Sequence, residues 1–181
     1  MGLFDFLKKK SGTPKDIIKD VTLKTMKPGY FVDYDMKTWE VTGCHYYDWG
    51  NGDITHEWQL KSHDETLYLE HEEDDEDIFS ISKKLSMSRL DKHILDHILE
   101  HDDPPEQIRF EGTDYFLEET SGGRYFKDAT ASPREMIKWD YSDESGKEYL
   151  TIEQWGETDF EASLGKPAET YQFTNILPDS F

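Results

Sequence analysis

The sequence predicts a mainly β protein of the α+β class, built from antiparallel sheets or partly open barrels in two loosely repeated halves. Short runs of alternating apolar and polar residues recur along the chain, separated by turn-forming Gly, Pro, Asn and Asp residues. Aromatic residues make up 14% of the 181 residues, although hydrophobic residues reach only 35%. Disordered chains are poor in aromatics, so this composition suits sheets faced by large amphipathic side chains. We therefore expect a single β-rich domain over residues 13–181.

The most informative stretch is residues 138–155, KWDYSDESGKEYLTIEQW, which predicts a β-hairpin around a turn-forming loop. Because side chains alternate along a strand, Leu150 and Ile152 share one face and Glu153 and Trp155 the other. We expect the first pair to enter the core. The second pair covers another layer, where a carboxylate between aromatic residues is a candidate for a site.

Two similar halves are expected, at about residues 21–82 and 107–178, joined by a helix over residues 88–101. Strands are expected near residues 21–26, 30–34, 38–47, 53–60, 67–69 and 78–81, and then at 107–110, 115–118, 124–126, 135–141, 147–155, 159–163 and 170–174. Each half places a Glu close to a Trp, at Glu57-Trp58 and at Glu153-Gln154-Trp155. This correspondence suggests a degenerate duplication, although similar hairpins are common in β-rich chains.

The predicted helix carries an apolar face and begins at Ser88 and Asp91, which have capping-box spacing. His93, His97 and His101 follow one another at intervals of four residues, so they form a stripe on the helix. Such a stripe is a weak candidate for a zinc or nickel site. The alternative is the polar flank of an amphipathic helix.

The first twelve residues predict a basic amphipathic tail. The residues that make it a candidate interaction site are Leu3, Phe4, Phe6, Leu7, Lys8, Lys9 and Lys10. Residues 1–30 hold seven Lys and three Asp, a net +4, so the remaining chain carries −20 − 4 = −24. We expect a protein partner, and peripheral membrane contact through residues 1–10, with a tail packed on the body as the alternative.

Several of these motifs together resemble the bacterial family known as domain of unknown function 4178. The resemblance is carried by residues 56–60 (HEWQL), 110–117 (FEGTDYFL), 139–141 (WDY), 150–156 (LTIEQWG), Gly165 and residues 176–178 (ILP). The resemblance implies no established activity. It does imply an association with membrane-stress and phage-shock-type proteins in bacterial gene clusters, which would suit a cytoplasmic factor with a membrane-seeking tail.

Glu57 and Glu153 are weak catalytic candidates, because two carboxylates facing one cleft can share acid and base roles. Structural glutamates that bind backbone or indole groups are the alternative. The acidic run at residues 70–77 is expected to be a solvated loop, with Ca²⁺ or a basic partner as its functional alternative. Cys44 is expected to be a buried thiol, since the neighbouring His45 points to the opposite face of the strand.

The net charge of −20 excludes binding to nucleic-acid backbone, which requires a surplus of Lys and Arg. A single cysteine, the lack of a long apolar run and the lack of a signal peptide predict a cytoplasmic protein, with contact to the inner membrane as a further expectation. No nucleotide motif is present, and we expect no cofactor. The leading hypothesis is a non-catalytic protein-interaction module. The alternatives are a hydrolase using Glu57 and Glu153 or a helix-borne metal, and an acidic immunity or DNA-mimic protein.

Overall fold

The computed structural model describes residues 21–130 and 132–178. Their strands are β1 (Phe31–Tyr34), β2 (Lys37–Gly50), β3 (Asp53–Lys61), β4 (Thr66–Glu73), β5 (Asp77–Leu85), β6 (Gln107–Phe110), β7 (Thr113–Phe126), β8 (Arg134–Asp143), β9 (Tyr149–Gln154), β10 (Phe160–Ala168) and β11 (Phe173–Leu177). The helix α2 spans Lys92–His101, and short 3-10 turns lie at η1 (Leu23–Thr25), η2 (Met87–Arg89), η3 (Lys127–Ala129) and η4 (Thr170–Gln172).

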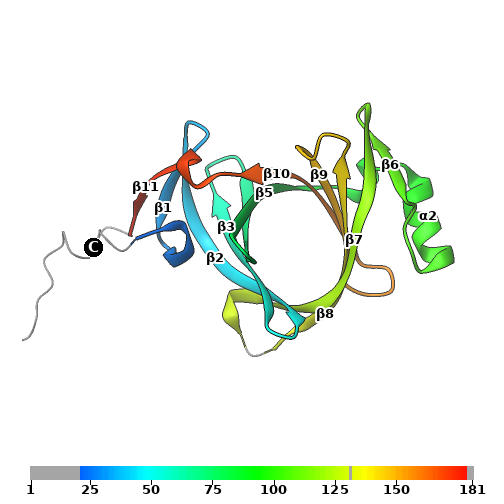
Figure 1. The fold of residues 1–181 in the computed structure, drawn as a ribbon, viewed down its shortest axis with the longest axis horizontal. Coiled ribbons are helices and arrows are strands. Elements are labelled where there is room, and N and C mark those ends of the chain that lie inside the picture. Colours follow the sequence, from blue (N-terminus) through cyan, green and yellow to red (C-terminus); the bar gives the residue numbers. More distant parts are fainter. Residues whose placement is uncertain (1–20, 131, 179–181) are drawn as a thin grey trace, which may run out of the picture.

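All of these strands belong to one antiparallel sheet, in the order β11-β1-β2-β3-β4-β5-β10-β9-β8-β7-β6. Because β2 also pairs with β7, the eight strands from β2 to β7 in this order close on themselves (Figure 1). We call these eight strands the ring. β1 and β11 extend the sheet beyond β2, and β6 extends it beyond β7. The prediction of a mainly β fold with antiparallel sheets and one α-helix near residues 88–101 is confirmed.

The sheet contains two series of strands that follow one another in the chain, β1 to β5 and β6 to β9. β10 lies between them, since Ala162 is opposite Leu85 of β5 on one side and Ile152 of β9 on the other. β11 then returns to β1, where Phe173 is opposite Tyr34. β10 therefore joins the two series, and β11 extends the sheet beyond β1.

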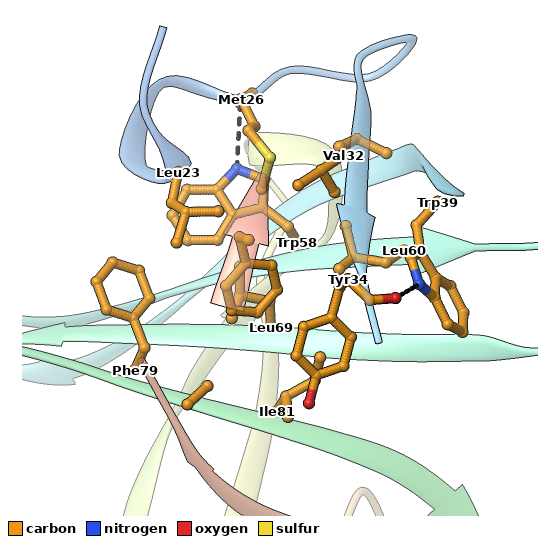
Figure 2. Packing of buried hydrophobic residues seen from close by; sticks show 13 residues of the cluster. Leu23, Met26, Val32, Tyr34, Trp39, Trp58, Leu60, Leu69, Phe79 and Ile81 are labelled. Carbon is orange, nitrogen blue, oxygen red and sulfur yellow. Dashed lines mark hydrogen bonds between the residues drawn. The ribbon is translucent and has the colours of Figure 1, made fainter. Parts of the chain in front are cut away.

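The apolar residues of the ring strands pack on its outer face, in two separate clusters. The first lies under β1, β11 and η1 and includes Val32, Trp58, Leu60 and Leu69 (Figure 2). Two tryptophans there bind backbone: Trp58 Nε1 donates to the Met26 carbonyl at 3.1 Å, and Trp39 Nε1 donates to the Tyr34 carbonyl at 2.9 Å. These bonds hold η1 and β1 against the ring.

The second cluster lies under α2 and β6. It is formed by Leu85, Leu90, Ile94, Ile98, Ile108, Phe110, Tyr115, Trp139, Tyr141, Leu150, Ile152 and Ala162. Figure 1 shows α2 outside the ring, beside β6 and β7. Leu150 and Ile152 are fully buried in this cluster, as the alternation in residues 138–155 predicts. The predicted hairpin is confirmed as β8 and β9.

A β-bulge in β2 decides which of its side chains enter the ring. The register between β2 and β3 shifts between Val41 and Gly43. Before the bulge, Trp39 and Val41 belong to the first apolar cluster, outside the ring. After the bulge, His45 and Tyr47 line the ring interior. An extra residue in one strand reverses the alternation, so the bulge brings an aromatic hydroxyl into the ring.

Several boundaries differ from the sequence-based expectation. Residues 115–118 and 124–126, expected as separate strands, belong to the single strand β7, and residues 170–172 of the strand expected at 170–174 form η4. Residues 21–26 were expected to form a strand, but they contain η1, in which a Thr25–Thr22 backbone bond closes a tight turn. The helix begins at Lys92 rather than at Ser88, because Asp91 is its N-cap and accepts a hydrogen bond from the His93 N–H at 3.0 Å.

The expectation of a solvated loop over residues 70–77 is wrong for most of that run. Glu70 to Glu73 complete β4, and Asp77 begins β5, so only residues 74–76 form the turn. The acidic side chains of β4 alternate between the ring interior and its outside, because they occupy a strand. Glu70 consequently faces the ring interior, where it meets a lysine.

Candidate functional site

The interior of the ring is lined by polar and ionisable side chains. They are the neighbours, along each strand, of the apolar residues that pack outside: Glu57 precedes Trp58, Glu153 follows Ile152, and Lys138 precedes Trp139. All three ionisable side chains are buried, with 4% to 7% of their surface exposed. The closed ring therefore removes from water the face that a flat sheet would leave solvated.

Glu57 and Glu153 meet at one hydroxyl group. The Tyr47 hydroxyl lies 3.1 Å from Glu57 Oε2 and 3.3 Å from Glu153 Oε1, and Tyr125 donates a longer bond of 3.4 Å to Glu57 Oε1. The Tyr47 hydroxyl has one proton, so it can donate to only one carboxylate at a time. The second contact becomes a hydrogen bond when one carboxyl group carries a proton of its own.

The surroundings favour Glu57 as the protonated partner. Burial, together with the nearby charges of Glu70 and Glu153, raises the pKa of Glu57 to about 8. Burial also raises the pKa of Glu153, but Lys84 and Lys138 oppose that effect. A carboxyl group with a pKa near neutrality can donate or accept a proton at physiological pH.

Two lysines bind the carboxylates of this group: the buried Lys138, whose ion pair crosses the ring from β8 to β4, and the more exposed Lys84. Lys138 Nζ on β8 donates to Glu70 Oε2 on β4 at 3.0 Å, and Lys84 on β5 binds Glu153 at 3.2 Å and also Glu161. The neighbouring carboxylates raise the pKa values of both lysines against the effect of burial. We call Tyr47, Glu57, Glu70, Lys84, Lys138 and Glu153 the charged layer.

A cavity lies on each side of the charged layer. The first, of about 370 Å³, has the charged lining residues Lys84, Lys127, Arg134, Glu57 and Glu161, and we call it the basic cavity. The second, of about 240 Å³, is lined by Glu70, Glu72, Glu118, Glu119, Asp140 and Lys138, and we call it the acidic cavity. Along β4 the basic cavity is reached at Tyr68 and the acidic cavity at Glu72, so the two lie towards opposite ends of the ring.

Burial raises the pKa values of two carboxyl groups in the acidic cavity, Glu72 and Asp140. Their main contacts are hydroxyls: Thr55 donates to Glu72 at 3.4 Å and Thr151 donates to Asp140 at 2.6 Å. Lys138 lies 3.8 Å from Asp140 and lowers its pKa in part. The acidic cavity is thus a region of concentrated negative charge.

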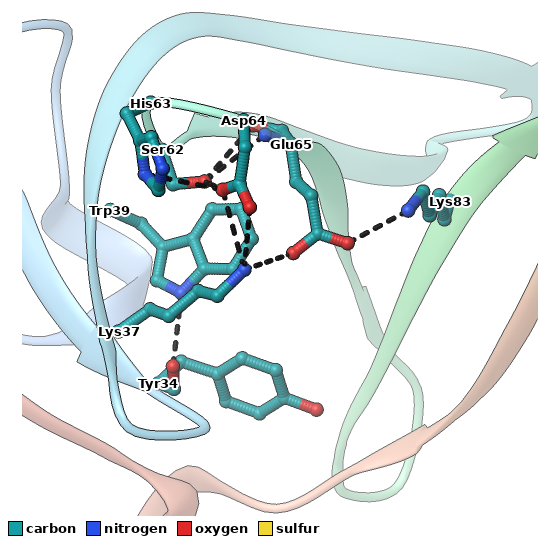
Figure 3. Close-up of polar contacts among 8 residues, drawn as sticks. All are labelled: Tyr34, Lys37, Trp39, Ser62, His63, Asp64, Glu65 and Lys83. Atoms are coloured by element: carbon teal, nitrogen blue, oxygen red, sulfur yellow. Dashed lines mark hydrogen bonds and ion pairs between the residues drawn. The ribbon is translucent and has the colours of Figure 1, made fainter.

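A third cavity, of about 560 Å³, lies on the outer face of β5 and β10, between the hairpins β1-β2 and β6-β7. Figure 3 shows the polar contacts at one of its walls: Lys37 binds Asp64 at 3.3 Å and also Glu65, and Lys83 binds Glu65 at 2.8 Å. The Trp39 indole lies beside this group and donates to the Tyr34 carbonyl. The carboxylates of Asp64 and Glu65 therefore neutralise these two lysines.

The helix histidines lie outside the ring, on α2. The rings of His97 and His101 are 4.4 Å apart, edge to face, and His97 Nδ1 is buried without a hydrogen-bond partner in the described part of the chain. Over residues 21–130 and 132–178, three ligand-type side chains come within 4.8 Å of one another at His71, Glu73 and Asp77, a group that does not include the helix histidines. The Lys24 ammonium is 2.9 Å from Asp77 and 3.3 Å from Glu73, so a cation already neutralises that group.

Other predicted residues have simpler settings. Cys44 is half-buried against the outer cluster, its Sγ is 3.6 Å from the Met26 carbonyl, and burial raises its pKa to about 11, which is unsuitable for a nucleophile. The interaction residues of the tail, from Leu3 to Lys10, lie outside the described residues. No helix among the described residues is both long enough and apolar enough to cross a membrane.

Tyr47, Lys84 and Lys138 belong to the site but were not among the sequence-based candidates, and Glu70 was considered only as part of the acidic run at residues 70–77. Their signal is positional, because each lies an even number of residues from another interior residue on its own strand: Lys138 from Asp140, and Glu70 from Glu72. Finding them would have required the knowledge that the polar faces of the strands turn towards one another.

Comparisons with known proteins agree with the resemblance in the sequence. The model of the family described as "Domain of unknown function (DUF4178)" matches residues 27–170. A relative from Aquifex aeolicus (strain VF5), titled "Uncharacterized protein", is 28% identical over 156 residues, which cover 86% of this chain and 85% of the relative. No solved structure matches the chain.

Proposed function

Because the chain belongs to the family described as domain of unknown function DUF4178, a description that states no activity, we propose a function from the geometry. The protein is a non-catalytic binding module that holds a small polar molecule inside the ring. The observation that carries this proposal is the inverted distribution of side chains. Apolar clusters lie outside the ring, and two cavities inside it flank the charged layer, in which Glu57, Lys138 and Glu153 are buried.

Energetics support this proposal. Taking a charge out of water costs several kcal/mol, and apolar side chains of similar size would often fill the same space with equal or greater stability. Closed rings of eight strands have interiors that side chains can just fill or that can hold one small ligand. An interior that keeps polar groups around open volume has the composition expected of a polar-ligand site.

The test is retention of small molecules by the full chain. The immobilised protein is incubated with a bacterial metabolite extract, and mass spectrometry identifies what it retains. Two variants each fill one cavity, Gln59→Trp in the basic cavity and Ser80→Phe in the acidic cavity, and Leu99→Phe adds a ring on the exposed face of α2 as the matched control.

We expect compounds that the wild type and Leu99→Phe retain and that one filled variant loses. Melting curves show which variants are folded. Because each cavity has its own filled variant, the test remains possible if one of the two variants does not fold. No compound retained above the level of a blank column, or equal retention by the wild type and by a folded filled variant of each cavity, would refute the proposal.

A second function is favoured by one specific observation, the Tyr47 hydroxyl shared by Glu57 and Glu153. Glu57 lines the basic cavity, and a carboxyl group that holds its proton near neutral pH is suited to general acid catalysis. In this proposal Glu57 gives its proton to the leaving group, a water molecule forms the new bond to the substrate carbon, and the Glu57 carboxylate recovers a proton from that water. Glu153, held by Lys84, keeps the Tyr47 hydroxyl oriented.

Hydrolysis of chromogenic esters and glycosides tests the second function. An enzyme of this kind turns over at least one substrate, loses that turnover in Glu57→Gln, and keeps it in Glu118→Gln, a carboxylate at the acidic cavity. A wild type without turnover, or turnover that survives Glu57→Gln, excludes this role.

A further inference from the structure

We propose that the basic cavity binds a small organic anion with a planar apolar body, of the class of the aromatic carboxylates. The proposal rests on the ring-interior function above and names its ligand.

The charge of the basic cavity runs against that of the whole protein. The chain has a net charge of −20, yet the cavity gathers three basic side chains, Lys84, Lys127 and Arg134, against Glu57 and Glu161. Lys84 is paired with Glu153 and Glu161, and Arg134 is paired with Asp159. Lys127 is therefore the cation of this cavity that no described carboxylate neutralises, and an uncompensated ammonium group at the rim attracts an anion.

Two of the basic side chains have donors to offer. Lys127 is exposed at the rim and makes no ion pair within residues 21–130 and 132–178. Arg134 binds Asp159 and the Trp155 carbonyl through one of its nitrogens, which leaves other guanidinium donors available. A carboxylate between Lys127 and Arg134 would receive charge-assisted hydrogen bonds from both.

An indole N–H in the same wall lacks an acceptor. Trp155 lines the basic cavity, and its Nε1 is buried without a hydrogen-bond partner in the described part of the chain. Buried donors are nearly always paired, so an unpaired donor requires an explanation. In this proposal an anion oxygen in the cavity is the missing acceptor, which requires the indole to turn its buried Nε1 towards the ligand.

Aromatic rings form the apolar part of the wall. Trp155 meets Tyr125 edge to face at 5.3 Å between ring centres, Tyr125 lies 4.9 Å from Tyr47, and the Arg134 guanidinium lies 5.0 Å above the Trp155 ring. Tyr68, on another strand, adds a ring whose hydroxyl makes no hydrogen bond with the described residues. The volume of about 370 Å³ accommodates one small aromatic molecule.

Indole N–H signals in ¹H–¹⁵N NMR spectra test the assignment. The full chain is titrated with benzoate and with two comparison ligands. Inorganic phosphate is an anion without a planar apolar body, and benzylammonium has the planar body but the opposite charge. Trp155→Phe identifies the Trp155 signal. We expect benzoate to move this signal downfield, while the signal of Trp39, which is already bonded to a carbonyl outside the ring, stays in place.

Charge-removing variants locate the carboxylate. Lys127→Gln and Arg134→Gln should each weaken benzoate binding about fivefold, equivalent to about 1 kcal/mol for a partly exposed charge contact. Lys92→Gln, at the start of α2 outside the ring, should leave the affinity unchanged.

The assignment would be overturned if benzylammonium or phosphate bound as tightly as benzoate. It would also be overturned if Lys127→Gln, Arg134→Gln and Lys92→Gln all bound benzoate with equal affinity. The result is separate from that of the metabolite screen. If the screen yields only uncharged or cationic compounds, the binding function stands and the anionic ligand does not.

Discussion

Replacing Glu57 by Gln should change how the stability of the protein depends on pH. Glu57 keeps its proton up to about pH 8 in the folded protein, whereas its ordinary pKa is 4.5. Between these values the folded state binds more protons than the unfolded state, so the free energy of unfolding falls as the pH rises. Glutamine keeps a neutral side chain of nearly the same shape, and the Glu57→Gln variant should lose this decline.

The magnitude follows from the shift. One pKa unit corresponds to about 1.4 kcal/mol, so a rise from 4.5 to about 8 would give on the order of 5 kcal/mol if the site stayed closed. Water entering the two adjacent cavities would reduce this value. We expect Glu57→Gln to match the wild type near pH 5 and to be more stable by roughly 2 to 5 kcal/mol at pH 8.5.

Urea denaturation followed by tryptophan fluorescence at pH 5, 6.5 and 8.5 measures this difference. Contributions from other carboxylates cancel between the wild type and Glu57→Gln, and Glu100→Gln on α2 serves as a surface control. A stability difference between Glu57→Gln and the wild type that stays constant from pH 5 to 8.5 would refute protonation of Glu57. A variant that becomes relatively less stable at high pH would refute it as well.

Four further results are expected. Lys138→Met should lower the free energy of unfolding by about 3 to 5 kcal/mol, because it leaves buried carboxylates unpaired, and adding Glu70→Gln should restore part of the loss in the same urea assay. The Cys44 thiol, whose pKa is raised to about 11, should react with iodoacetamide at pH 7.5 at least tenfold more slowly in the folded than in the unfolded protein, as followed by mass spectrometry; equal rates would contradict its burial. Asp91→Ala removes the N-cap of α2 and should lower the unfolding free energy by about 1 kcal/mol, whereas no loss would show that the cap contributes nothing. Deleting residues 2–10 should abolish co-sedimentation with anionic vesicles; binding that persists, or that is absent from the full chain too, would exclude a membrane role for the tail.

Local structure was predictable where local patterns determine it. The β8-β9 hairpin follows from the turn residues and the alternation in residues 138–155, and α2 follows from an apolar stripe that ends before Pro104 and Pro105. The errors at residues 21–26 and 70–77 arise where local preference and context compete. Leu23 lies in a 3-10 turn and not in a strand, yet its side chain still packs into the first apolar cluster. The acidic residues of β4 have low strand propensity, but the strand forms because it pairs with β3 on one side and β5 on the other.

The site was predictable only in part, because its geometry depends on closure of the ring. Glu57 and Glu153 were identified from the sequence, but their approach through Tyr47 depends on pairing between β2 and β7, which lie far apart in the chain. Alternation in residues 53–60 predicts a half-buried strand with one polar face. That face is buried as well, since the opposite side of the ring covers it, and no local pattern in the sequence encodes that covering.

The position of β10 constrains the order in which this protein can fold. While a ribosome is still adding residues before Phe160, β5 and β9 each present an unpaired edge, and the Lys84 and Glu153 side chains lack their shared enclosure. Formation of the last ring strand must bring together segments about eighty residues apart in the chain, so closure is expected to be a late and slow event. A nascent chain that lacks β10 would expose the edges of β5 and β9 to pairing with other chains, so chaperone protection would be most useful before residues 160–168 are made.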